Sequence, residues 1–121
     1  MNKLIILFIS LLISGSAFAQ SISNVEQQGN WYNIYNHQGK KVKTLSAATI
    51  GEVKGWCSEF LIAQDGSWFS LYNADGKKLK TFNTNTVGEV ISVSANTFTT
   101  KMGNWIYTYD ANGKKLNTRH Q

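Results

Sequence analysis

The chain has 121 residues, a net charge of +5 at pH 7, no proline and one cysteine, Cys57. A single cysteine excludes an internal disulfide, so sheet packing must hold the small core that a chain of this length can bury. One cysteine and two scattered histidines give no ligand spacing for a metal, and no metal site is predicted.

The first 19 residues are predicted to be a secretory signal peptide. A positive charge at Lys3 precedes a short apolar stretch, residues 4–13, and Ala17 and Ala19 form an Ala-x-Ala cleavage site. The stretch is shorter than the ~20 residues of a membrane-spanning helix. We therefore expect cleavage after Ala19, a periplasmic or secreted protein that does not span the membrane, and one domain over residues 20–121.

The rest of the chain repeats with a period of 37 residues. The three copies read GNWYNIYNHQGKKVKT from Gly29, GSWFSLYNADGKKLKT from Gly66 and GNWIYTYDANGKKLNT from Gly103. A fixed period in this range is typical of architectures in which one supersecondary unit is copied and stacked.

Each repeat is predicted to form four short strands. In chain order they are 22–27, 31–36, the Lys-Lys run after Gly39, 50–56, 59–64, 67–73, the run after Gly76, 87–94, 97–101, 105–110 and the run after Gly113. The turn before each Lys-Lys run begins with Asn or Asp and ends with Gly, as in a three-residue hairpin loop closed by glycine at positive φ. Residues 46–49 and 83–86 are predicted to be polar links.

These eleven strands predict an all-β fold. Short links make neighbouring strands antiparallel and give a meander. A small barrel or a folded-over sandwich is the simplest closure, because long open sheets curl or split. Propeller-like blades closed by dimerisation and a β-trefoil are the alternatives.

The repeated aromatic residues have two interpretations. Alternation places Trp31 and Tyr35 on one face of their strand and Tyr32 on the other. Packing between repeats is the favoured interpretation for the triplet Trp31, Trp68 and Trp105, because each unit must bury a face against the next. The alternative is an aromatic binding platform for sugar rings or peptide.

Lysines gather after the same turn in every copy. They are Lys40, Lys41, Lys43, Lys77, Lys78, Lys80, Lys114 and Lys115. Three equivalent loops should present the Lys-Lys pairs on one rim, either as a solvated edge that discourages aggregation or as a site for an anionic partner. Nucleic acid is a poor candidate partner, because arginine is almost absent.

No catalytic constellation is predicted. Catalysis should reside in residues that break the repeat, namely His37, Cys57 and His120, and a Cys57/His37 nucleophile pair is conceivable. No family signature surrounds the cysteine. The alternative to a catalytic role is a structural one, in which Cys57 is a small core residue and Glu52 and Glu89 are cross-strand partners of lysine. We expect no enzyme activity and no cofactor.

The Tyr-Asn/Asp-x-x-Gly-Lys core, nearest in Tyr109-Asp110-Ala111-Asn112-Gly113, resembles the tyrosine-aspartate repeats of bacterial Rhs-type surface and toxin shells. The Gly-Asn-Trp opening is similar to bacterial WG-type β-hairpin repeats, with Tyr32, Phe69 or Ile106 in place of their glycine. The resemblance covers about a third of residues 20–121. It implies a non-catalytic envelope or secreted repeat protein of bacteria.

The sequence therefore predicts an exported, non-catalytic binding or interaction module. Its partner would be an anionic glycan or envelope component, held by Lys40, Lys41, Lys77, Lys78, Lys114 and Lys115, with Trp31, Trp68 and Trp105 as further binding residues. The alternative is a periplasmic inhibitor or immunity protein that binds a toxin or hydrolase. Homodimer formation is left open.

Overall fold

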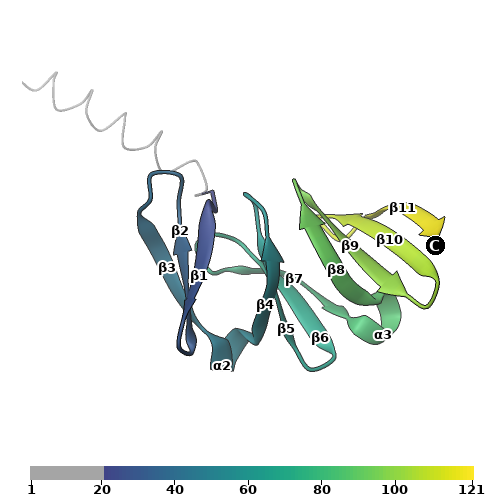
Figure 1. The fold of residues 1–121 in the computed structure, drawn as a ribbon, viewed down its shortest axis with the longest axis horizontal. Coiled ribbons are helices and arrows are strands. Elements are labelled where there is room, and N and C mark those ends of the chain that lie inside the picture. Colours follow the sequence, from purple (N-terminus) through teal and green to yellow (C-terminus); the bar gives the residue numbers. More distant parts are fainter. Residues whose placement is uncertain (1–20) are drawn as a thin grey trace, which may run out of the picture.

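The computed structural model describes residues 21–121, which form eleven strands in three antiparallel sheets (Figure 1). The predicted signal peptide lies outside the described residues. The first sheet contains β1 (Asn24–Gln28), β2 (Trp31–Tyr35) and β3 (Lys41–Ser46). The middle sheet contains β4 (Glu52–Trp56), β5 (Leu61–Asp65), β6 (Trp68–Tyr72) and β7 (Lys78–Asn83). The third contains β8 (Glu89–Ser94), β9 (Thr97–Met102), β10 (Trp105–Asp110) and β11 (Lys115–His120). The predicted all-β fold of eleven antiparallel strands is confirmed.

The meander is interrupted twice, at the links predicted to be polar. Single-turn helices α2 (Ala47–Ile50) and α3 (Thr84–Val87) carry the chain out of one sheet and into the next. Gly88 follows α3 at φ +98°, where a Cβ would lie 2.6 Å from the carbonyl oxygen of Lys101, so only glycine fits the exit. Gly51 has the same place after α2, at φ +90°.

These two exits separate the strands into three sheets. The predictions of one small barrel and of a trefoil, which is built on a barrel, are therefore wrong. The predicted folded-over sandwich is correct in that separate sheets pack face to face around apolar cores, but there are three sheets and not two. Figure 1 shows the sheets side by side as successive blades, with β4 and β8 neighbouring each other. The propeller-like alternative describes this stacking, and its closure into a ring by dimerisation stays a prediction.

Two hydrophobic cores join the sheets. Val25, Tyr32 and Ile34 of the first sheet pack with Leu61 and Ala63 of the middle sheet. The opposite face of the middle sheet forms the second core with the third sheet; its buried members are Phe60, Ile62, Phe69, Leu71, Phe82, Phe98 and Tyr109. The middle sheet is thus apolar on both faces, as an internal repeat must be.

The outward faces of the two terminal sheets are polar. In the first sheet, Asn24, Glu26 and His37 replace Leu61, Ala63 and Ala74, the repeat-equivalent residues that pack in the first core. In the third sheet, Thr99, Thr108 and Arg119 replace Ile62, Leu71 and Phe82 of the second core. Polar residues at these positions prevent the outer sheets of a repeat array from exposing an apolar face to solvent. It disfavours the stacking of a further sheet on either end.

Candidate binding rims

Three nearly identical turns form one end of the three sheets. Each opens with Asn36, Asn73 or Asp110, whose Oδ1 accepts the backbone N–H of the residues two and four positions later at 2.9–3.0 Å. Each closes with a glycine at positive φ, between +77° and +85°, as predicted. The first polar side chain organises the whole turn, so the residues that follow are placed alike in every sheet.

The lysine pairs after these turns form what we call the lysine rim, consisting of Lys40, Lys41, Lys77, Lys78, Lys114 and Lys115. All six are exposed. Within residues 21–121 the single ion pair joins Lys54 and Glu52, at 3.1 Å, so no rim lysine is paired with a carboxylate there. The Nζ of Lys115 lies 4.3 Å from the ring centroid of Tyr107, a cation–π contact. The lysine rim is therefore a concentration of positive charge with little internal neutralisation.

Lys43 and Lys80 have a different role from the rim lysines. A Cβ on Gly76 would lie 3.0 Å from Cε of Lys43, and a Cβ on Gly113 would lie 3.1 Å from Cε of Lys80. The stem of each lysine thus rests against the turn of the following sheet. The equivalent residue of the third sheet, the last of the described sheets, is Asn117.

The three repeated tryptophans lie at the other end of the sheets. Trp31, Trp68 and Trp105 begin β2, β6 and β10, the strands that end at the turns of the lysine rim. At a rise of about 3.3 Å per residue, a five-residue strand separates the two ends by roughly 15 Å. We call this set the tryptophan rim. The two groups of predicted binding residues are therefore not brought together.

The favoured interpretation, in which these tryptophans are buried by packing between repeats, is wrong. Trp31 is 53% exposed, Trp68 55% and Trp105 46%. They stand at strand starts beyond the edge of the cores, whereas the next residue along β2 and β6, Tyr32 or Phe69, points inward and is buried. The packing interpretation holds instead for the repeated tyrosines Tyr72 and Tyr109, which are 7% and 5% exposed.

Burial changes the acidity of one of these tyrosines. Desolvation raises the pKa of the Tyr109 phenol above its ordinary value, and the neighbouring Tyr107 adds to the effect. The Tyr109 ring stacks on Phe98, with centroids 5.3 Å apart, inside the second core. Tyr109 thus belongs to the packing between sheets and remains neutral well into alkaline solution.

The residues that break the repeat are scattered. His37 is exposed on a turn of the first sheet, Cys57 is half-buried and packs on the second core, and His120 meets Trp105 edge-on with centroids 4.8 Å apart. Cys57 packs on the second core and His37 lies on an exposed turn of the first sheet, so this arrangement gives no support to the hypothesis of a Cys57/His37 pair. Over the described part of the chain, no three His, Cys, Asp or Glu side chains gather to hold a metal.

One of the two equivalent glutamates has a lysine opposite it on the neighbouring strand: Glu89 lies opposite Lys101, whereas Glu52 lies opposite Gln64. Glu52 pairs with Lys54 of its own strand, two residues away. Glu89 lies opposite Lys101 in register, but its Oε1 accepts a long hydrogen bond of 3.5 Å from Gln64 of the middle sheet. Neither arrangement forms a pair of carboxylates.

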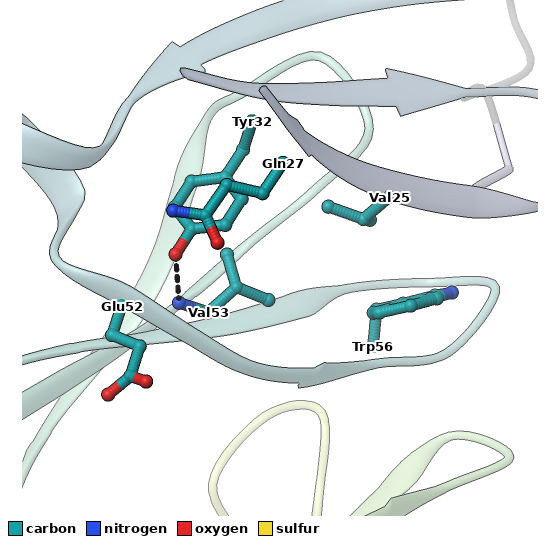
Figure 2. A pocket seen from close by; sticks show the side chains of 6 residues that line it. All are labelled: Val25, Gln27, Tyr32, Glu52, Val53 and Trp56. Atoms are coloured by element: carbon teal, nitrogen blue, oxygen red, sulfur yellow. Dashed lines mark hydrogen bonds between the residues drawn. The ribbon is translucent and has the colours of Figure 1, made fainter. Parts of the chain in front are cut away.

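A hollow of about 220 Å³ opens between the first and middle sheets (Figure 2). Val25, Gln27 and Tyr32 line it from the first sheet, and Glu52, Val53 and Trp56 from β4. The backbone N–H of Val53 donates to the Tyr32 hydroxyl at 3.2 Å across the two sheets. Trp56, 39% exposed, forms a wall of this hollow.

Comparison with known proteins gives no family assignment. The chain matches no protein-family model, and no curated protein is significantly similar to it. In residues 21–121 no helix has the length and apolar character needed to cross a membrane.

Proposed function

We propose that the protein is an exported, non-catalytic binding module that holds a polyanionic ligand on its lysine rim. The observation that carries the proposal is the exposure of six lysines, which follow three turns with the same hydrogen bonds and are unpaired with any carboxylate among the described residues. A ligand with negative charges would neutralise this concentrated charge. The chemistry that fits is an anionic glycan or another anionic component of the cell envelope.

The spacing of the lysine pairs favours an extended ligand over a small ion. Sheets that pack face to face lie about 10 Å apart, so the pairs recur at roughly that interval along the rim. A single phosphate or carboxylate would reach one pair, whereas a polymer with regularly spaced charges would contact all three. Each contact is individually weak at an exposed site, and their number supplies the affinity.

Charge reversal on the rim tests this function. The triple variant Lys41→Glu, Lys78→Glu and Lys115→Glu should lose retention on immobilised heparin and on lipopolysaccharide. The wild-type protein should be retained at low salt and released as salt rises, because exposed charges are screened over about 10 Å at 0.1 M.

A second triple variant controls for net charge. Lys54→Glu, Lys101→Glu and Arg119→Glu change the net charge by the same amount but lie outside the lysine rim. This variant should keep most of its retention, and both variants should unfold at a urea concentration close to that of the wild type. Equal loss in the two variants, or no retention of the wild type at low salt, would show that the rim is only a solvated edge.

A second candidate function is that of a periplasmic inhibitor or immunity protein for a toxin or hydrolase. The observation that favours it is the exposure of Trp31, Trp68 and Trp105, since tryptophan is enriched at the centres of protein interfaces. Capture from periplasm and culture medium should then yield one stoichiometric protein partner, lost when the three tryptophans become alanine. Capture unchanged by those substitutions would remove this candidate.

A further inference from the structure

Among residues 21–121, the first sheet has three strands, one fewer than each of the other two sheets. β4 lies beside β5, and β8 lies beside β9. By the 37-residue register, β1 is the counterpart of β5 and β9, yet it pairs only with β2 among the described strands. One edge of β1 therefore presents backbone N–H and C=O groups that can accept another strand.

The hollow in Figure 2 lies where a fourth strand would fit. Side chains of β1 line one side of it and side chains of β4 line the other. β8 contacts β4 in the neighbouring pair of sheets, and a strand beside β1 would contact β4 in the same way. In Figure 2 the side chains of Val25 and Trp56 face each other across the space that this strand would enter.

The sequences of β4 and β8 indicate which side chains fit the position beside β1. Both follow a glycine and begin with Glu-Val, at Glu52-Val53 and Glu89-Val90. A Cβ on Gly55 of β4 would lie only 2.8 Å from Cγ2 of Val93 in β8. Trp56 is the repeat equivalent of Val93, so a strand beside β1 must present glycine or another very small residue to the larger Trp56 ring.

We propose that the hollow between β1 and β4 accepts one extended segment of a partner polypeptide, which pairs with β1 and completes the first sheet. The segment would carry the pattern shared by β4 and β8, a glycine, then an acidic and an apolar residue, with a small residue against Trp56. Main-chain hydrogen bonds to β1 provide affinity, and Val25, Tyr32 and Trp56 select the side chains. This site is independent of the lysine rim.

A partner segment fits better than a second copy of this chain. In a second copy, the two strands that carry this pattern, β4 and β8, are already paired within their own sheets and contact each other. Pairing of two β1 edges centred on Glu26 would place two carboxylates opposite each other, which is unfavourable.

The probe for this site is a synthetic peptide with the sequence of residues 88–94, which forms β8 in the third sheet. The peptide should bind the purified protein and slow the hydrogen exchange of alternate amides of β1. Two versions of the peptide, N-methylated at residues 90 and 92 or at residues 91 and 93, should differ in affinity. Methylation of the two amides that point toward β1 should abolish binding, whereas methylation of the two that point away should be tolerated.

Substitution of the wall residue gives the control. Trp56→Ala should weaken peptide binding about tenfold, because an aromatic contact at the centre of an interface is lost. Trp68→Ala, a change of the same size at the tryptophan rim, should leave binding unchanged. Equal effects of the two N-methylation patterns, tighter binding by Trp56→Ala, or protection of β9 instead of β1 would overturn the proposal. A protein that sediments as a dimer and takes no peptide would assign the β1 edge to a second copy.

Discussion

At the scale of single residues, strand position decides which aromatic side chains hold the molecule together. Trp68 and Phe69 are neighbours in β6, yet Trp68 is 55% exposed and Phe69 is fully buried between Phe82 and Phe98. From residue type alone, the larger tryptophan would be expected to contribute more to stability. The position of Trp68 at the end of the sheet, beyond the cores, reverses that order.

Alanine substitution of these neighbours should show the reversal. Phe69→Ala should lower the free energy of unfolding by about 3–5 kcal/mol, since it leaves a cavity at a fully buried site. Trp68→Ala should cost only about 1–2 kcal/mol, because half of the ring is already in water. Urea unfolding of both variants beside the wild type checks the ranking. A larger loss for Trp68→Ala would mean that the tryptophan rim is covered in solution.

Tyr109 should make stability depend on alkaline pH. Its pKa is raised in the folded protein by burial, so the folded state holds the phenolic proton to higher pH than the unfolded chain does. The stabilisation is complete below the ordinary pKa of about 10 and is lost as the pH rises through the folded-state pKa. Tyr109→Phe should flatten this decline, measured as the unfolding midpoint between pH 8 and 11. An unchanged decline would place the responsible group elsewhere.

At the scale of elements, the turns and links were predictable to different degrees. The Asn-x-x-Gly pattern predicted the three rim turns because a side-chain acceptor and a glycine at positive φ are local requirements. The links after β3 and β7 could not be resolved in the same way. Their residues form single helical turns whose glycines are confined by the carbonyl groups of Gln64 and Lys101, which are distant in sequence.

Substitution of two turn glycines distinguishes the cost of local backbone strain from the cost of disturbed packing between sheets. Gly39 and Gly76 have similar φ values, +77° and +81°, so alanine should cost about 1–2 kcal/mol of backbone strain at either position. A Cβ on Gly39 meets nothing within 4 Å, whereas one on Gly76 meets Lys43 and Leu45 of the first sheet at 3.0 Å. Gly76→Ala should therefore lower the free energy of unfolding by at least as much as Gly39→Ala, and by more if Leu45 cannot move.

Thermal unfolding of the two variants measures this difference. A larger loss for Gly39→Ala would contradict the packing of the first sheet against the turn of the middle sheet.

At the scale of the whole molecule, the sequence predicted the strand number but not the closure. Period, alternation and turn residues are all local, and they are sufficient to count eleven strands. Whether consecutive strands stay in one sheet depends on contacts between repeats, such as those of Leu61 with the first core and Phe98 with the second. The same contacts explain why His37 replaces the alanines Ala74 and Ala111. The alanines pack between sheets, whereas His37 lies on the outer face of the first described sheet.

The polar outer faces predict a protein that does not stack into larger arrays. Changing Asn24→Leu, Glu26→Ala and His37→Ala would give the first sheet the residues of the middle sheet's packed face. An apolar patch of this kind drives association. Sedimentation should find the wild type monomeric and the triple variant self-associated. Self-association of the wild type that this variant abolishes would show that the outer face is an interface.

We propose that ligand binding resides on the lysine rim, at the end of the sheets opposite the tryptophans. Hydrogen exchange of the wild-type protein with and without heparin at low salt tests it most directly. Exchange should slow at the three turns before Lys41, Lys78 and Lys115 and should be unchanged around Trp31, Trp68 and Trp105. Protection at the tryptophan rim, or at neither rim, would contradict it.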